Sequence, residues 1–217
     1  QSAIAKKWRK ERVFLAGDAA HLMPPFMGQG MCAGIRDASN LAWKINHCIK
    51  NGHNEKLLNS FQSERFSNVK EYIQTTMKMG EFINAMRSYK IADTVSDQSD
   101  GSKSMKSIKP ELGPGLGLKS NKHRGKIFPK FNIKNSKSFD DIFSTEPVLI
   151  VSDNLSVGKL KSKIKIIKEA SYKELSKIFK KFQVEAIIIR PDRFILETFN
   201  SRENFIKKIN KTLQGII

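Results

Sequence analysis

Residues 17–44 read GDAAHLMPPFMGQGMCAGIRDASNLAWK, and this stretch decides the fold that the sequence predicts. The apolar run 12–16 comes directly before it and predicts a buried strand that ends in the Gly-Asp turn. Behind the two prolines, apolar residues recur at steps of three and four, which predicts a helix over about residues 31–49. A strand, a glycine-containing turn and a helix in this order predict an α/β fold.

The apolar residues of this first helix fall on one stripe, which predicts that the stripe packs into the protein core. The stripe consists of Met31, Ile35, Ala38, Ala42, Ile45 and Ile49. Gly52 predicts the end of the helix, because glycine readily adopts the backbone conformation that follows a helix. Asn54 predicts the cap of a second helix that runs to about Ser88.

The Gly-Asp turn and the Gly-Gln-Gly turn point to ligand binding. In open α/β sheets, ligands bind at the carboxyl edge of the strands, where Asp18 offers a carboxylate that can accept hydrogen bonds from sugar hydroxyls. The helix that opens at residues 28–30 presents free N–H groups and a positive dipole end, which favour a negative or electron-rich ligand atom. Together these features suit a ribose-bearing cofactor whose other end gains negative charge during the reaction.

The same string resembles the second flavin-binding motif of the class A FAD-dependent aromatic hydroxylases, in their phenol hydroxylase and 3-(3-hydroxyphenyl)propionate hydroxylase branch. Weaker resemblances follow in the same order along the chain, at residues 57–65, 112–116, 125–129 and 186–192. The resemblance implies a monooxygenase that uses FAD, NADH or NADPH, and oxygen to hydroxylate a small phenolic substrate. A ubiquinone-type or polyketide hydroxylase is the alternative within the family.

The resemblance also implies roles for individual residues. Gly17 and Asp18 would bind the ribitol or ribose region of FAD, while Pro24 and Pro25 would lie beside the flavin ring on the substrate side. The residues that would offer backbone N–H groups to the pyrimidine edge of the flavin are Gly28, Gln29, Gly30 and Met31. Cys32 stands where many relatives have Asn and would keep a backbone role. No catalytic side chain is identified.

Four other residues of the stretch have structural interpretations. His21 is expected to donate a hydrogen bond to nearby backbone rather than to act in catalysis. Arg36 and Asp37 are expected to form an ion pair that holds the first helix against neighbouring elements. Trp43 is expected to pack in the core.

Composition and resemblance together divide the chain into three parts. Residues 1–91 resemble the C-terminal part of a Rossmann-like FAD-binding domain, and residues 92–126, rich in Ser, Asp, Lys, Gly and Pro, predict a linker or extended surface segment. Residues 127–217 resemble a small thioredoxin-like α/β domain. Within this domain the pattern predicts strands at 147–151, 164–167, 184–190 and 194–199, a helix at 171–182 and a last helix capped by Ser201.

The sequence contains no GxGxxG motif behind a strand, although the enzymes it resembles begin with one that binds the FAD pyrophosphate. The Asp-Gly motif that these enzymes link to flavin and NAD(P)H is also missing. We therefore expect the chain to be the C-terminal part of a longer enzyme and to be inactive as an isolated fragment. An inactive relict is the alternative.

The 217 residues contain 39 Lys and Arg against 21 Asp and Glu, a formal net charge of +18. Residues 101–217 hold 25 of the basic and 11 of the acidic residues, so the excess lies mostly there. A basic module of this kind could bind nucleic acid or an acidic partner. Few aromatic residues lie among the lysines as stacking platforms, which instead favours solvated lysine faces and no nucleic-acid partner.

Cysteines and hydropathy complete the sequence expectations. Cys32 and Cys48 form neither a CxxC pair nor a metal-ligand cluster, so we expect buried free thiols, no metal site and a reducing, cytoplasmic setting. No apolar run approaches the ~18 to 20 residues of a membrane span, so none is expected. A homodimer is compatible with the resemblance.

Overall fold

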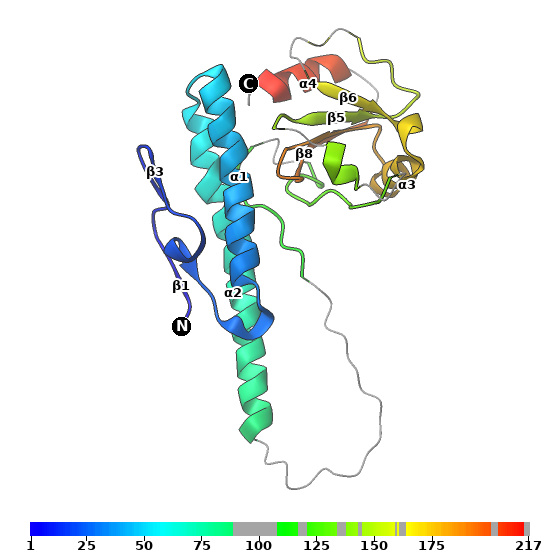
Figure 1. Ribbon diagram of the computed structural model, residues 1–217. Helices are drawn as coiled ribbons and strands as arrows, with labels where there is room; N and C mark the ends of the chain where they lie inside the picture. The colour runs from blue at the N-terminus through cyan, green and yellow to red at the C-terminus, as the bar shows by residue number, and fades with distance from the viewer. Residues whose placement is uncertain are drawn as a thin grey trace, which may run out of the picture.

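The computed structural model describes residues 1–88, 108–116, 121–133, 138–142, 145–158, 160, 164–200 and 204–214. Two long helices lie side by side as an antiparallel hairpin, with a small sheet unit near the end where the first helix gives way to the second (Figure 1). None of the helices in the described ranges is long and apolar enough to cross a membrane.

The helical hairpin consists of α1 (Gly30–Asn51) and α2 (Glu55–Ser88). Gly52 ends α1 with a φ of 96°, and its N–H donates to the Cys48 carbonyl. The Asn54 side chain accepts a hydrogen bond of 2.9 Å from the Leu57 N–H and thereby caps α2. The predicted end of the first helix, the cap of the second and its extent to Ser88 are confirmed.

The N-terminal segment forms two short antiparallel pairs beside the hairpin (Figure 1). β1 (Ala3–Ile4) pairs with β4 (His21–Leu22), and β2 (Arg9–Lys10) pairs with β3 (Val13–Phe14). The predicted buried strand over residues 12–16 is wrong, because only Val13 and Phe14 pair as a strand and Val13 is 67% exposed. In the described part of the chain β3 has one partner strand and no covering layer above Val13.

The C-terminal unit is a mixed sheet with the strand order β6-β5-β7-β8. Its strands are β5 (Val148–Val151), β6 (Lys165–Lys168), β7 (Ala186–Ile189) and β8 (Ile195–Phe199). β6 runs parallel to β5, whereas β5 with β7 and β7 with β8 are antiparallel pairs. The helices α3 (Lys173–Phe182) and α4 (Phe205–Gln214) complete the unit. The predicted strands and helices are confirmed with slightly different bounds, β6 being shifted by one residue from the predicted 164–167, while Ser201 lies outside the described residues.

Both faces of this sheet are buried, which explains why its central strands are apolar at every position. One face packs against α3 and against Phe128 and Phe139. The other face packs against α4 and against the helical hairpin, through Trp43 of α1 and Leu57 of α2. The predicted packing role of Trp43 is confirmed, and the sheet unit and the hairpin share one continuous apolar core.

The first helix buries the face opposite to the one that its apolar stripe predicts. Met31 and Ile49 are 76% and 78% exposed, so the expectation of a buried stripe is wrong. The buried residues of α1 are Ala33, Asp37, Asn40, Trp43, Lys44 and His47. The helix turns this mostly polar face to α2 and the sheet unit because charged partners there neutralise it. Cys32 and Cys48 are free but only half-buried.

The described residues 108–116 and 121–126 form neither helix nor regular strand, yet they pack tightly between the two units. Leu112 and Leu116 are buried. A Cβ on Gly113 would lie 2.3 Å from the Ser63 carbonyl oxygen, and one on Gly115 would lie 2.3 Å from the Glu64 side chain. Glycine is required at both positions because the backbone runs directly against α2.

Candidate functional site

The Gly-Asp turn is a single 3₁₀ turn, Gly17–Ala19, which packs against the start of α1. Gly17 has a φ of 58°, and a Cβ on Gly34 of α1 would lie only 3.4 Å from the Gly17 Cα. Asp18 is exposed, and no described residue donates a hydrogen bond to its carboxylate. The turn therefore holds a free acceptor group beside the first turns of the helix.

A buried cluster of charged side chains holds this turn against α1 and α2. The Asp37 carboxylate accepts hydrogen bonds from the Gly17 N–H at 2.9 Å and from Arg65 Nε at 2.7 Å. The same carboxylate lies 2.7 Å from Nε2 of the buried His21. Burial alone would raise the pKa of Asp37, but His21 and Arg65 outweigh it and lower that pKa. Asp37 therefore stays ionised and ties the turn to both long helices.

Two sequence expectations change here. The expectation that His21 bonds to backbone is wrong, because its Nε2 meets the Asp37 carboxylate instead. The expected ion pair of α1 with its neighbours is confirmed for Asp37 but wrong for Arg36. Arg36 instead donates to Gln29 Oε1 at 3.5 Å and lies over the Tyr72 ring at 5.1 Å. Tyr72 offers this cation a π face in place of a carboxylate.

The proline loop between the turn and α1 is held by the contact of the Phe26 ring with Gly80 of α2. Pro24 is buried, and Pro25–Met27 forms a short 3₁₀ turn that ends at Gly28 in the left-handed conformation, φ 60°. A Cβ on Gly80 of α2 would lie 2.4 Å from the Phe26 ring. The Phe26 ring can therefore contact α2 at this point only because residue 80 has no side chain.

The start of α1 presents unpaired N–H donors. Gln29 occupies the N-cap position without a side-chain cap, and the first helical hydrogen bond runs from the Ala33 N–H to the Gln29 carbonyl at 2.8 Å. The N–H groups of Gly30, Met31 and Cys32 have no acceptor in the described part of the chain. Such unpaired donors at the positive end of a 22-residue helix form a site for a negative or electron-rich atom.

Comparison with known proteins shows what the chain is similar to. A family model described as FAD binding domain matches residues 1–76. The probable NADH-specific resorcinol 4-hydroxylase of Rhodococcus jostii (strain RHA1) is 35% identical over 164 residues, which cover 72% of this chain and 30% of that protein. The chain is related to the FAD-dependent aromatic hydroxylases. A 3-(3-hydroxy-phenyl)propionate/3-hydroxycinnamic acid hydroxylase of Klebsiella pneumoniae (strain 342) is 44% identical over 80 residues, 37% of this chain and 14% of that protein.

Solved hydroxylase structures show the same fold. Aklavinone-11 hydroxylase, solved with FAD and aklavinone, matches with a TM-score of 0.71 and 19% identity over 99% of this chain and 45% of that one. The anhydrotetracycline hydroxylase OxyS from Streptomyces rimosus matches with a TM-score of 0.67 and 19% identity over 99% of this chain and 46% of that one. The chain thus spans less than half the length of these hydroxylases.

The residues present fit the flavin cofactor of this hydroxylase family. Asp18 is an exposed carboxylate that can accept hydrogen bonds from hydroxyl groups, and the start of α1 offers unpaired N–H donors. At Gly28 a Cβ would meet nothing within 4 Å, so space is open beside the backbone where a ring could approach. The Gly-Asp turn and the proline loop both lie near the start of α1 (Figure 1).

A second buried cluster joins the hairpin to the sheet unit, and sequence reasoning missed it. Glu64 of α2 accepts hydrogen bonds from Arg190 Nη1 and from Lys44 Nζ, each at 2.8 Å. Arg190 also donates to Asp192 at 2.6 Å, and its guanidinium lies 5.2 Å from the Trp43 ring centroid. The hairpin and the sheet unit are therefore locked together by ion pairs as well as by apolar packing.

The ionisation of this second cluster follows from its burial and its partners. Burial alone would raise the pKa of Glu64, but Arg190 and Lys44 lower it well below its usual range. Burial lowers the pKa of Lys44 to about 8, although Glu64 opposes the change. A signal for the cluster was present in the sequence. Polar residues recur at steps of three and four along α1, on the side opposite the apolar stripe, at Asp37, Asn40, Lys44 and His47.

Proposed function

We propose that this chain contributes to the flavin site of an FAD-dependent monooxygenase that hydroxylates a small phenolic substrate with NADH or NADPH and oxygen. The observation that carries the proposal is the joint position of the free Asp18 carboxylate and the uncapped start of α1, both fixed by the buried Asp37. The names of the relatives, a resorcinol hydroxylase and hydroxyphenylpropionate hydroxylases, support the substrate class.

The proposed roles follow from the chemistry of each group. Gly17 and Asp18 bind the ribitol or ribose region of FAD, with the carboxylate accepting hydrogen bonds from its hydroxyl groups. The backbone N–H groups of Gly30, Met31 and Cys32 donate hydrogen bonds to the pyrimidine edge of the flavin. The expected donor role of Gly28 is not kept, because its N–H already donates to the Pro25 carbonyl at 3.0 Å. The positive end of α1 stabilises negative charge there. When bound, FAD supplies the redox and oxygen chemistry, and the protein positions it and tunes its charge.

The proline loop supplies the substrate side of the proposed site. Pro24 is fixed by burial, and the Phe26 ring is fixed on Gly80, so Pro25 is held between two anchored neighbours. A stiff loop excludes water from one side of the ring and keeps the substrate oriented. No described side chain is assigned a proton-transfer role.

The proposed organisation keeps residues 1–91 as part of the FAD-binding domain, 92–126 as the connection and 127–217 as a thioredoxin-like domain. The mixed sheet, with one parallel and two antiparallel pairs, and its two helices support the last assignment. The exposed apolar stripe of α1 supports a covering layer from the rest of the hydroxylase. A cytoplasmic location and a homodimer belong to the same proposal.

A chimeric enzyme tests the proposed function. This chain would replace the matching region of the Rhodococcus resorcinol hydroxylase, and the purified chimera would be analysed for bound FAD by absorbance and for resorcinol-dependent NADH oxidation. We expect both signals in the chimera and a strong loss of bound FAD with Asp18→Ala. Glu81→Ala, which changes an exposed carboxylate on α2, is the matched control. Equal FAD content in two folded variants would refute the role of Asp18.

A further inference from the structure

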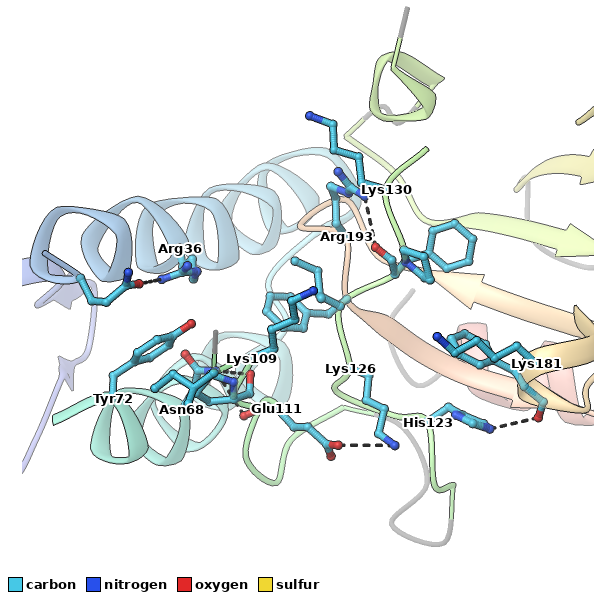
Figure 2. Close-up of a pocket in the computed structure, with 18 residues that line it drawn as sticks. Arg36, Asn68, Tyr72, Lys109, Glu111, His123, Lys126, Lys130, Lys181 and Arg193 are labelled. Atoms are coloured by element: carbon cyan, nitrogen blue, oxygen red, sulfur yellow. Dashed lines mark hydrogen bonds and ion pairs between the residues drawn. The ribbon is translucent and has the colours of Figure 1, made fainter. Parts of the chain in front are cut away.

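A cavity of about 800 Å³ lies between the helical hairpin and the sheet unit (Figure 2). Its walls come from α1, α2, α3, the described residues 108–111 and 123–130, and the loop between β7 and β8. Six cationic side chains line it: Arg36, Lys109, Lys126, Lys130, Lys181 and Arg193. Glu111 is the single acidic residue among its lining residues.

The carboxylate in the wall neutralises little of this charge. Glu111 forms one ion pair, with Lys126 at 3.5 Å, and both side chains keep a large exposed fraction. Arg36 is held by Gln29 and by the Tyr72 ring, neither of which carries a negative charge. Six positive charges against one negative charge around one concave space create a positive potential that attracts anions.

The cavity also has rigid polar walls. Asn68 is buried, and its side-chain amide donates to the Pro110 carbonyl at 2.6 Å, which fastens the segment 108–116 to α2. Tyr72 is buried under Arg36, and burial raises its pKa, so the phenol stays neutral. His123 is buried and lies 3.1 Å, through Nε2, from the Phe182 carbonyl. These contacts hold the walls in place before any ligand arrives, which lowers the entropic cost of binding.

Size and charge together select the class of ligand. The volume lies within the range of about 300–1,000 Å³ that is typical of pockets for cofactor-sized molecules. The cations are spread over several elements rather than gathered at one point (Figure 2), which fits a ligand with more than one anionic group. We propose that this cavity binds a nucleotide through its phosphate groups.

The position of the cavity connects it to the proposed flavin site. Gln29, the N-cap residue of α1, is part of the cavity wall, so a nucleotide bound there would end beside the helix start. Identification of that nucleotide as NADH or NADPH rests on the proposed function, because the monooxygenase reaction consumes one of them. Binding of phosphate groups to the basic walls does not depend on it.

Titration of the purified chain without FAD tests this proposal. The probes are NADH, NADPH, ADP-ribose and inorganic pyrophosphate, each followed by isothermal titration calorimetry at two salt concentrations. We expect the nucleotides to bind, with affinity falling as salt increases. Replacing two exposed lysines of the rim, Lys109→Gln with Lys130→Gln, should weaken binding about tenfold or more because charge-assisted contacts to phosphate are lost. The matched control is Lys70→Gln with Lys56→Gln on the exposed side of α2.

Each outcome decides the proposal. Failure of all four probes to bind, or binding of pyrophosphate alone, overturns a nucleotide site. Equal weakening by the rim pair and the control pair overturns the cavity as its location. Because the four substituted lysines are exposed, the variants should fold, which circular dichroism checks. Nucleotide binding by a chain whose chimera fails to retain FAD would refute the proposed function and leave the cavity site standing.

Discussion

Two charged regions of the molecule differ in their balance of charge and in their exposure to water. The cluster between the hairpin and the sheet unit contains two cations, Lys44 and Arg190, and two anions, Glu64 and Asp192, all of them buried. The neighbouring cavity has six cations and one anion in its walls. Charges that lose their water must be matched within the fold, because an unpaired buried charge is very costly. Charges that keep contact with water, such as those of the exposed Lys109, Lys130 and Lys181, need no partner within the fold and can therefore meet a ligand.

Truncation of Glu64 should disrupt the buried cluster of paired charges, and it has the largest expected effect on stability. Glu64→Ala leaves Lys44 and Arg190 buried without their shared carboxylate, so the free energy of unfolding should fall by about 3–5 kcal/mol. Urea denaturation followed by circular dichroism measures it. Glu111→Ala, which removes the carboxylate of the cavity, should change stability by less than about 0.5 kcal/mol. Equal effects of the two substitutions would contradict the distinction between the regions.

Neutralisation of Asp37 tests the other buried cluster. Asp37→Asn removes the negative charge that Arg65 and His21 face, so the free energy of unfolding should fall by about 2–3 kcal/mol. Asp18→Asn changes an exposed carboxylate of the same turn and should leave thermal stability within about 0.5 kcal/mol of wild type. Both variants should lower FAD retention in the chimera. A stable Asp37→Asn protein would show that the cluster does not fix the turn.

Acid should destabilise the protein by protonating Glu64 in the buried cluster of paired charges. The pKa of Glu64 in the folded chain lies below the ordinary value of 4.5, so between these two values the unfolded chain binds more protons. The contribution of Glu64 to stability is therefore fully present above about pH 4.5 and is lost as the pH falls through the folded pKa. Urea midpoints measured from about pH 6 to pH 3 should decrease in wild type. A flat profile in wild type would be inconsistent with an ionised, paired Glu64.

Removal of a cavity cation has the smallest expected effect on stability. Lys130→Gln deletes one exposed charge from a region that already holds an excess of positive charge, so stability should stay within about 0.5 kcal/mol of wild type or rise. Thermal denaturation at low salt measures the change. A clear loss of stability would mean that Lys130 is matched within the fold, and the contrast between the two regions would then be reduced.

Local signals predicted the helices and the sheet well. Gly52 and Asn54 marked the turn of the hairpin because a positive φ and a side-chain cap are local properties of the chain. The apolar runs at 147–151 and 184–190 predicted strands, and in the structure both are central strands whose two faces are buried. The resemblance at residues 17–44 led to the hydroxylase family, which the comparisons then supported independently.

Partners distant in sequence decided what local signals could not. The strand over 12–16 was predicted as buried from its composition, but burial requires a covering layer, and the described residues provide none above Val13. His21 found its partner sixteen residues away on α1, and Glu64 found Arg190 across 126 residues. No local pattern encodes such pairings.

The sequence by itself determined the two long helices, the strands and helices of the C-terminal unit, the order of the units and the Gly-Asp and Gly-Gln-Gly turns of the candidate flavin site, because these depend on neighbouring residues. Only the tertiary structure decided which face of α1 is buried. The apolar stripe predicted that one face of α1 is buried. The opposite face is buried instead, because Asp37 and Lys44 on it form fully buried ion pairs with Arg65 and Glu64 of α2. The apolar stripe of α1 consequently remains exposed in the described part of the chain.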